Sequence, residues 1–209
     1  MPSKPSMQLL SFLLYPVALV IRAIGRIFLF ILGWEFVAAK RNIPKAVAVM
    51  APHTSTWDII LGMAYMMASD VKINWVGKQS LFKGPLGIFF SLMGGMPLDR
   101  ENATDTVGQV VKIFDSKDKF IYGISPEATR DYRPYWRSGF YHIARRANVP
   151  MLLFFLDFKT KRVGCGPLIE TTGDAKKDLL KIKDFYDTVA AKNPEKMAPI
   201  RFKEDVAKS

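Results

Sequence analysis

From residue 45 onward, short apolar runs alternate with stretches of helical composition, and this alternation constrains the fold more than any other feature of the sequence. The runs are rich in branched and aromatic side chains, as strands buried on both faces of a sheet are. They occupy residues 46–50, 72–76, 120–124 and 151–157, and the helical stretches occupy 56–68, 80–93, 104–116 and 138–147. The alternation predicts an α/β fold, with a mixed, mostly parallel central sheet flanked by helices. Residues 162–169 add a predicted edge strand, and residues 174–191 a closing helix.

The N-terminal segment has a different character. Residues 7–21 are apolar and uncharged, Arg22 and Arg26 interrupt the run, and a second apolar run covers 27–36. Neither run reaches the roughly 20 apolar residues that cross a bilayer as a helix. A single span over both would bury two arginines, at about 2.5–3.5 kcal/mol each. We therefore expect a membrane-associated helical hairpin or bent helix that dips into one leaflet. Arg22 and Arg26 are four residues apart, so they would point together at lipid phosphates.

Two other interpretations of this segment compete with a membrane-associated helix. A secretory signal peptide would need a small-residue cleavage site after its apolar core, and arginines stand there instead. A buried core helix stays open, because short apolar runs do not distinguish the two. A chain of 209 residues suits one ordinary domain with an appendage. We expect residues 1–44 to be the membrane-associating helices and residues 45–209 to form one α/β domain.

The charge of the chain limits its possible partners, and its cysteine and histidine content limits the possible disulfides and metal sites. The net charge of +11 would attract nucleic acid, anionic lipid or acidic substrates alike. The basic residues are scattered and form no nucleic-acid motif, so we expect membrane lipids and no nucleic acid as partners. The single cysteine, Cys165, excludes an intrachain disulfide and a cysteine zinc cluster, and it suits a reducing compartment. With only two histidines in the chain, we expect no metal site.

One histidine stands where ligands usually bind in open α/β sheets. His53 follows the first predicted strand of the sheet, at its carboxyl end, and Asp58 comes five residues later. If His53 lies in a loop and Asp58 in the first turn of the next helix, the carboxylate can hold one imidazole nitrogen. The other nitrogen is then free to act as a general base. A structural interpretation competes, because Ser55 to Asp58 is also a Ser-x-x-Asp capping box. The spacing alone leaves both open.

Three further motifs follow in order. They read GGMPLDR at 94–100, SPEATR at 125–130, and Asn-Val-Pro at 148–150. Together with APHTSTWD at 51–58, they resemble the four signature blocks of the glycerolipid acyltransferases, the family that includes lysophosphatidate and glycerol-3-phosphate acyltransferases. The resemblance makes residues 45–209 an acyltransferase catalytic domain.

The resemblance implies that the chain moves an acyl group from acyl-CoA or an acyl carrier protein to a hydroxyl of a lysophospholipid or glycerol phosphate. His53 would be the general base and Asp58 its orienting partner. Arg100 and Arg130 would bind the phosphate of the acceptor through paired, charge-assisted hydrogen bonds. The thioester is already an activated carbonyl, so no tightly bound cofactor is implied. The location implied is peripheral or monotopic, on the cytoplasmic face of a membrane.

Two more residues receive roles from the resemblance, and two depart from the family pattern. Glu127 would help shape the acceptor site, and Gly95, with Gly94, would allow the turn that presents the arginine of the second block. Pro52 stands where asparagine is commoner. Ala128 stands where glycine is usual, and its methyl group bears on the shape of the acceptor site.

Two rival functions compare poorly with the sequence. A serine hydrolase needs a G-x-S-x-G nucleophile elbow, and residues 123–127 lack the closing glycine. The second rival is a non-catalytic membrane-bound module that binds a lipid or a partner, in which His53 has no chemical role.

Overall fold

The computed structural model describes residues 4–39, 43–77, 79–97 and 105–203, with side chains from residue 15 onward. Six helices are found there: α1 Lys4–Ile31, α2 Thr56–Ala68, α3 Gly84–Leu92, α4 Thr106–Ser116, α5 Gly139–Arg146 and α6 Ala175–Tyr186. Two 3-10 turns accompany them, η1 Gln79–Phe82 and η2 Pro194–Lys196. The strands are β1 Glu35–Val37, β2 Lys45–Met50, β3 Ile73–Gly77, β4 Gly95–Pro97, β5 Phe120–Ile124, β6 Met151–Asp157 and β7 Arg162–Ile169.

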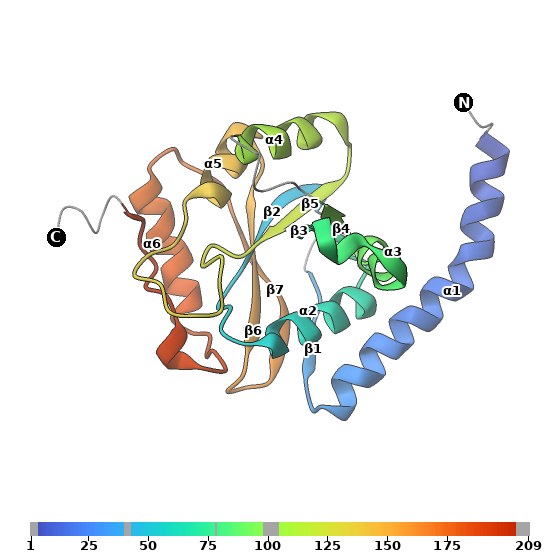
Figure 1. The fold of residues 1–209 in the computed structure, drawn as a ribbon, viewed down its shortest axis with the longest axis horizontal. Coiled ribbons are helices and arrows are strands. Elements are labelled where there is room, and N and C mark those ends of the chain that lie inside the picture. The colour runs from blue at the N-terminus through green and yellow to red at the C-terminus, as the bar shows by residue number, and fades with distance from the viewer. Residues whose placement is uncertain (1–3, 40–42, 78, 98–104, 204–209) are drawn as a thin grey trace.

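The strands form one sheet in the order β1-β7-β6-β2-β5-β3-β4. Every neighbouring pair is parallel except β6 with β7, which confirms the predicted mixed, mostly parallel sheet flanked by helices (Figure 1). The expectation that 162–169 is an edge strand is wrong, because β1 pairs with the outer side of β7. The strands β1 and β4 have three residues each, too few to show a pattern in the sequence.

The central strand β2 divides the core into two layers. Its residues alternate between the faces of the sheet. Val47 and Val49 are buried against α4, α5 and α6, whereas Ala46 and Ala48 are buried against α1 and α2. The small alanines leave room for α2 to lie close to the sheet on the face where the loop after β2 leads into that helix. β2 is thus a fixed base for the residues that follow it.

The N-terminal segment is one bent helix rather than a hairpin. α1 runs from Lys4 to Ile31 with Pro16 inside it, and its first part lies away from the rest of the protein (Figure 1). The turn just after its last residue contains Gly33, which has a φ of 72°, and the amide of Trp34 donates to the carbonyl oxygen of Leu29 there. This glycine-based end turns the chain into β1, so the second apolar run forms no second arm. β1 joins the sheet, which therefore extends across the expected boundary at residue 44.

The two arginines of α1 contact the C-terminal end of α2. Arg22 pairs with Asp70, and Arg26 Nε donates to the carbonyl oxygen of Ala68 at 3.3 Å. The last carbonyls of a helix carry partial negative charge and lack partners within the helix, so they attract cations. The expectation that both side chains point at lipid phosphates is wrong for this reason. Within the described residues, no helix has the length and apolarity needed to cross a membrane.

Candidate active site

The loop between β2 and α2 brings His53 and Asp58 together. His53 Nδ1 lies 3.3 Å from Asp58 Oδ2; the side chain of the histidine is 23 % exposed and that of the aspartate 4 %. The same Asp58 oxygen accepts hydrogen bonds from the backbone amides of Thr54, at 2.7 Å, and Ser55, at 2.8 Å. A buried carboxylate is thus fixed against one nitrogen of a partly accessible imidazole. That arrangement suits a general base.

Asp58 takes part in the capping box and in the contact with His53 at once. Ser55 caps α2, its hydroxyl oxygen accepts from the amide of Trp57 at 3.2 Å, and the capping box with Asp58 is complete. The cap does not compete with the imidazole contact, because one carboxylate oxygen takes part in both. Capping holds the carboxylate in place for His53. The other oxygen, Asp58 Oδ1, is buried without a hydrogen-bond partner among the residues that the structure describes.

Glu127 contacts the backbone of the same histidine. Its Oε2 accepts from the His53 amide at 2.5 Å, and the residue is buried. Burial raises the pKa of the Glu127 carboxyl above its ordinary value, although hydrogen bonds from the backbone of His53 and Ala198 act in the opposite direction. The structure therefore places Glu127 behind the histidine loop. The predicted role in shaping the acceptor site stays a prediction.

A segment far along the chain holds the loop from another side. The carbonyl oxygen of Thr54 accepts from Asn193 Nδ2 at 2.8 Å, and the Thr54 hydroxyl oxygen accepts from the Asn193 amide at 3.2 Å. Lys192 Nζ lies 4.9 Å from the centre of the Trp57 ring. Sequence reasoning missed Asn193, because it lies 139 residues from Thr54 in no motif. Only the fold reveals this contact.

Of the predicted phosphate ligands, the structure describes Arg130. Its Nη1 donates to Thr56 Oγ1 at 2.6 Å, which puts the exposed guanidinium beside the first residue of α2. The nearby Ala128 has a φ of 56°, in the left-handed region that favours glycine, as the usual family residue would suggest. Arg100, the other predicted ligand, lies outside the described residues.

Gly94 and Gly95 have separate roles in the local structure. Gly94 has a φ of 80° and forms the turn after α3. Gly95 is buried in β4, where an added Cβ would lie 2.7 Å from Phe82 Cε1 and 2.7 Å from the carbonyl oxygen of Phe90. Gly95 thus permits close packing under α3, and its predicted part in substrate binding stays a prediction.

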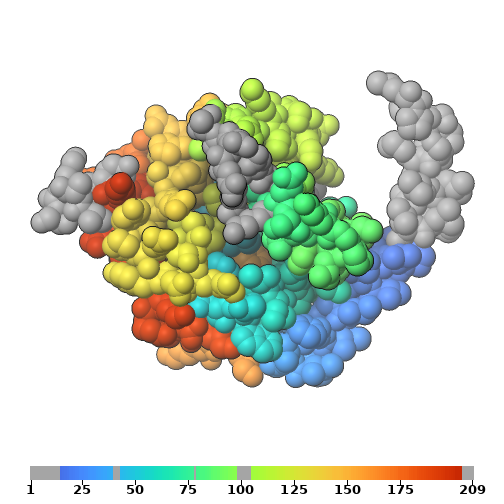
Figure 2. Space-filling model, in the orientation of Figure 1, coloured from blue at the N-terminus to red at the C-terminus, as the bar shows by residue number. Residues whose placement is uncertain are grey.

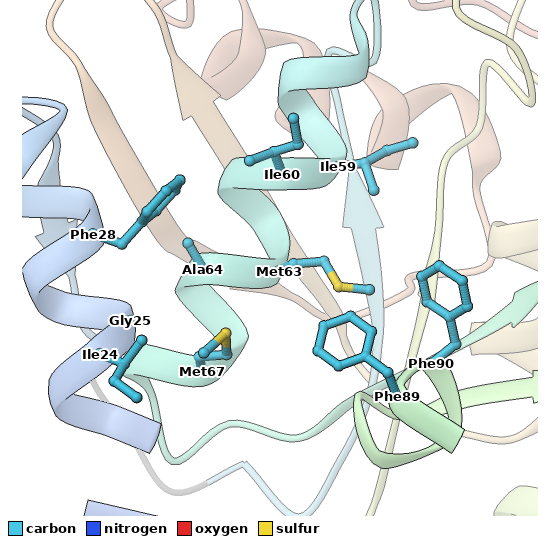
Figure 3. Close-up of a pocket in the computed structure, with 10 residues that line it drawn as sticks. All are labelled: Ile24, Gly25, Phe28, Ile59, Ile60, Met63, Ala64, Met67, Phe89 and Phe90. Carbon is cyan, nitrogen blue, oxygen red and sulfur yellow. The ribbon is translucent and has the colours of Figure 1, made fainter. Parts of the chain in front are cut away.

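An apolar groove of about 350 Å³ runs along α2, the helix that carries Asp58. Ile59 and Ile60, which follow Asp58 directly, line its upper end, and Met63 and Met67 line it further along α2 (Figure 3). Its other walls come from α1 and α3. The remaining lining residues are Ile24, Gly25, Phe28, Ala64, Phe89 and Phe90. A lining of this kind suits a hydrocarbon chain.

Comparisons with known proteins identify the family of this chain. The Acyltransferase family model matches residues 36–153, more than half of the chain. No curated protein matches. The crystal structure of the 1-acyl-sn-glycerophosphate (LPA) acyltransferase PlsC from Thermotoga maritima is similar, with a TM-score of 0.53 and 16 % identity, over 81 % of this chain and 76 % of that one. At that identity the likeness supports the fold. The match to the family model, together with this fold, shows that the chain belongs to the Acyltransferase family and is an acyltransferase.

Proposed function

We propose that this acyltransferase esterifies a hydroxyl of a lysophospholipid or glycerol phosphate with the acyl chain of acyl-CoA or an acyl carrier protein. The observation that carries the proposal is the buried Asp58 carboxylate held against His53, directly followed in the chain by two residues of an apolar groove. The proposed base and the proposed site for a hydrocarbon chain are thus joined through α2. The similar PlsC is by its printed name a 1-acyl-sn-glycerophosphate acyltransferase, which supports a phosphorylated glycerolipid acceptor.

In the proposed reaction, His53 Nε2 takes the proton of the acceptor hydroxyl while the oxygen attacks the carbonyl carbon of the thioester. Asp58 accepts the hydrogen bond of His53 Nδ1 and stabilises the imidazolium that forms. The C–O bond is then complete, the C–S bond breaks, and the leaving sulfur takes the proton from the imidazolium. The reaction is balanced without a metal or a tightly bound cofactor, because the thioester supplies the activated carbonyl.

We assign the apolar groove to the acyl chain and the Arg130 side of α2 to the acceptor phosphate. The N-terminus of a helix favours negative charge, and arginine forms paired hydrogen bonds with phosphate oxygens. Arg130 lies at this helix end through its contact with Thr56. Arg100 is the proposed second phosphate ligand.

We further propose that the protein binds a membrane through α1, as a peripheral or monotopic protein on the cytoplasmic face. The outward side of this helix exposes large apolar side chains, which water solvates poorly. They include Val20, Ile27 and Phe30, whereas Arg22 pairs with Asp70 and Arg26 contacts the last residue of α2. The lone buried cysteine suits the reducing side of the membrane.

The test is acyl transfer by the purified protein. A labelled acyl thioester, carried on CoA or on acyl carrier protein, is offered with lysophosphatidate, glycerol 3-phosphate and other lysophospholipids. His53→Ala should lower the turnover about 10²–10⁴-fold, the usual effect of losing a general base. His142→Ala is the matched control, because His142 is exposed on α5. Transfer to none of these acceptors, or a normal rate for His53→Ala, would refute the proposal.

A further inference from the structure

The helix α3 has no charged side chain and exposes large apolar ones. Leu86, Ile88 and Leu92 are 65 %, 66 % and 81 % exposed. Gly87 faces the other way and packs so closely on Phe82 that an added Cβ would lie 2.3 Å from its backbone. A helix that is apolar on every side is normally covered by protein or lipid. Within the described part of the chain, nothing covers these three side chains.

This exposed surface continues across the groove onto α1. Ile24 and Phe28 of α1 and Phe89 of α3 line the same groove from opposite sides (Figure 3). The space-filling view shows α3 in green and the described part of α1 in blue on one face of the molecule, next to α2 in cyan (Figure 2). The apolar side chains of the two helices therefore flank the groove on both sides.

The charges around the exposed apolar side chains of α1 and α3 indicate which kind of partner this surface suits. Residues 5–34 contain two arginines and no acidic residue, and the described residues 72–77 and 79–97 contain Lys72 and Lys83 and no acidic residue. Asp70, which follows the end of α2, pairs with Arg22. A second copy of the chain laid on the same face would bring like charges together. An anionic lipid surface complements both the apolar side chains and the positive charge around them.

We propose that α3 is a second membrane-contact element, whose Leu86, Ile88 and Leu92 enter the same leaflet of an anionic bilayer as α1. The groove between the two helices then opens into the lipid. This inference rests on the proposed function, because it supplies a path by which the acyl chain of a lipid substrate enters the groove without crossing water.

The test compares two variants in sedimentation with vesicles of phosphatidylcholine and phosphatidylglycerol. The triple variant Leu86→Ser, Ile88→Ser, Leu92→Ser removes the proposed contacts. Leu180→Ser, on α6, is the matched control, because Leu180 is 61 % exposed. Since all four side chains are exposed, both variants should unfold at the temperature of the wild type. The triple variant should bind vesicles at least about tenfold more weakly, and the control should bind as the wild type does.

Several results would overturn the inference. Wild-type binding by the triple variant is one, and equal binding of the wild type to vesicles without phosphatidylglycerol is another. A third is self-association of the wild type, seen by analytical ultracentrifugation, that the triple variant abolishes while vesicle binding is unchanged. Acyl transfer is measured separately on the same proteins. Vesicle binding that depends on α3 without any transfer would refute the proposed function alone, and transfer without such binding would refute the role of α3 alone.

Discussion

Substitution of Asp58 separates its two roles, because one carboxylate oxygen serves both. Asp58→Asn keeps a carbonyl oxygen that can accept from the amides of Thr54 and Ser55, so the cap of α2 survives. The variant loses only the favourable placement of a negative charge in the first helical turn, about 0.3–1 kcal/mol. Asp58→Ala leaves two backbone donors without their acceptor, and we expect a loss of about 2–4 kcal/mol.

The catalytic effect of Asp58→Asn follows from the distance between the two side chains. Two unit charges 3.3 Å apart attract by about 5 kcal/mol at an effective dielectric constant of about 20. The imidazole is partly exposed, which reduces this, and a carbonyl dipole replaces part of it. We therefore expect the transition state to lose about 2–4 kcal/mol, or about 30- to 1000-fold in kcat.

The assay measures thermal unfolding and acyl transfer on the same preparations. For a chain of this length, 1 kcal/mol corresponds to about 2–4 °C. Asp58→Asn should thus unfold within about 4 °C of the wild type while losing most activity, whereas Asp58→Ala should lose both. Asp105→Asn is the control, because Asp105 caps α4 and accepts from Gly108 at 2.7 Å. Normal turnover of Asp58→Asn would show that the aspartate only caps the helix.

Three further predictions concern stability. Above about pH 4.3, the free energy of unfolding of Glu127→Gln should rise relative to that of the wild type. Burial raises the pKa of the folded Glu127 carboxyl, so its ionisation opposes folding. Denaturation curves that give the same difference in unfolding free energy between the two proteins at pH 4 and at pH 7 would contradict this. Ala128→Gly should raise the free energy of unfolding by up to about 1 kcal/mol by relieving the left-handed φ of 56°, as urea denaturation measures. Gly25→Ala should lower the unfolding temperature at a cost of about 1–3 kcal/mol, because its Cβ would lie 2.6–2.8 Å from α2 backbone atoms, whereas Gly62→Ala, with open space around it, should not.

The elements whose burial is uniform could be predicted from the sequence. The runs at 46–50, 120–124 and 151–157 became β2, β5 and β6, because strands covered on both faces show their apolar character directly. The sequence left open whether the N-terminal segment is a hairpin or one bent helix, since the course of α1 depends on Arg22 contacting Asp70 and Arg26 contacting the end of α2. Local patterns do not contain such tertiary contacts.

The candidate site could likewise be predicted only in part from the sequence. The spacing of His53 and Asp58 predicted a possible contact but left it open against a capping role, and the structure shows the contact and the cap together. The contact of Asn193 with Thr54 joins residues far apart in the chain, and no local signal marks it. The placement of Glu127 behind the His53 amide likewise depends on the fold. The sequence therefore indicates the candidate catalytic groups, and the fold reveals which residues support them.

The packing of α1 on α2 has a mechanical consequence. Gly25 lets the two helices touch through their backbones, the arginines attach α1 to the far end of α2, and Asp58 occupies the first turn of that same helix. A displacement of α1 would therefore act directly on α2 through these contacts. If α1 binds a membrane as proposed, its position would bear on how Asp58 is held against His53.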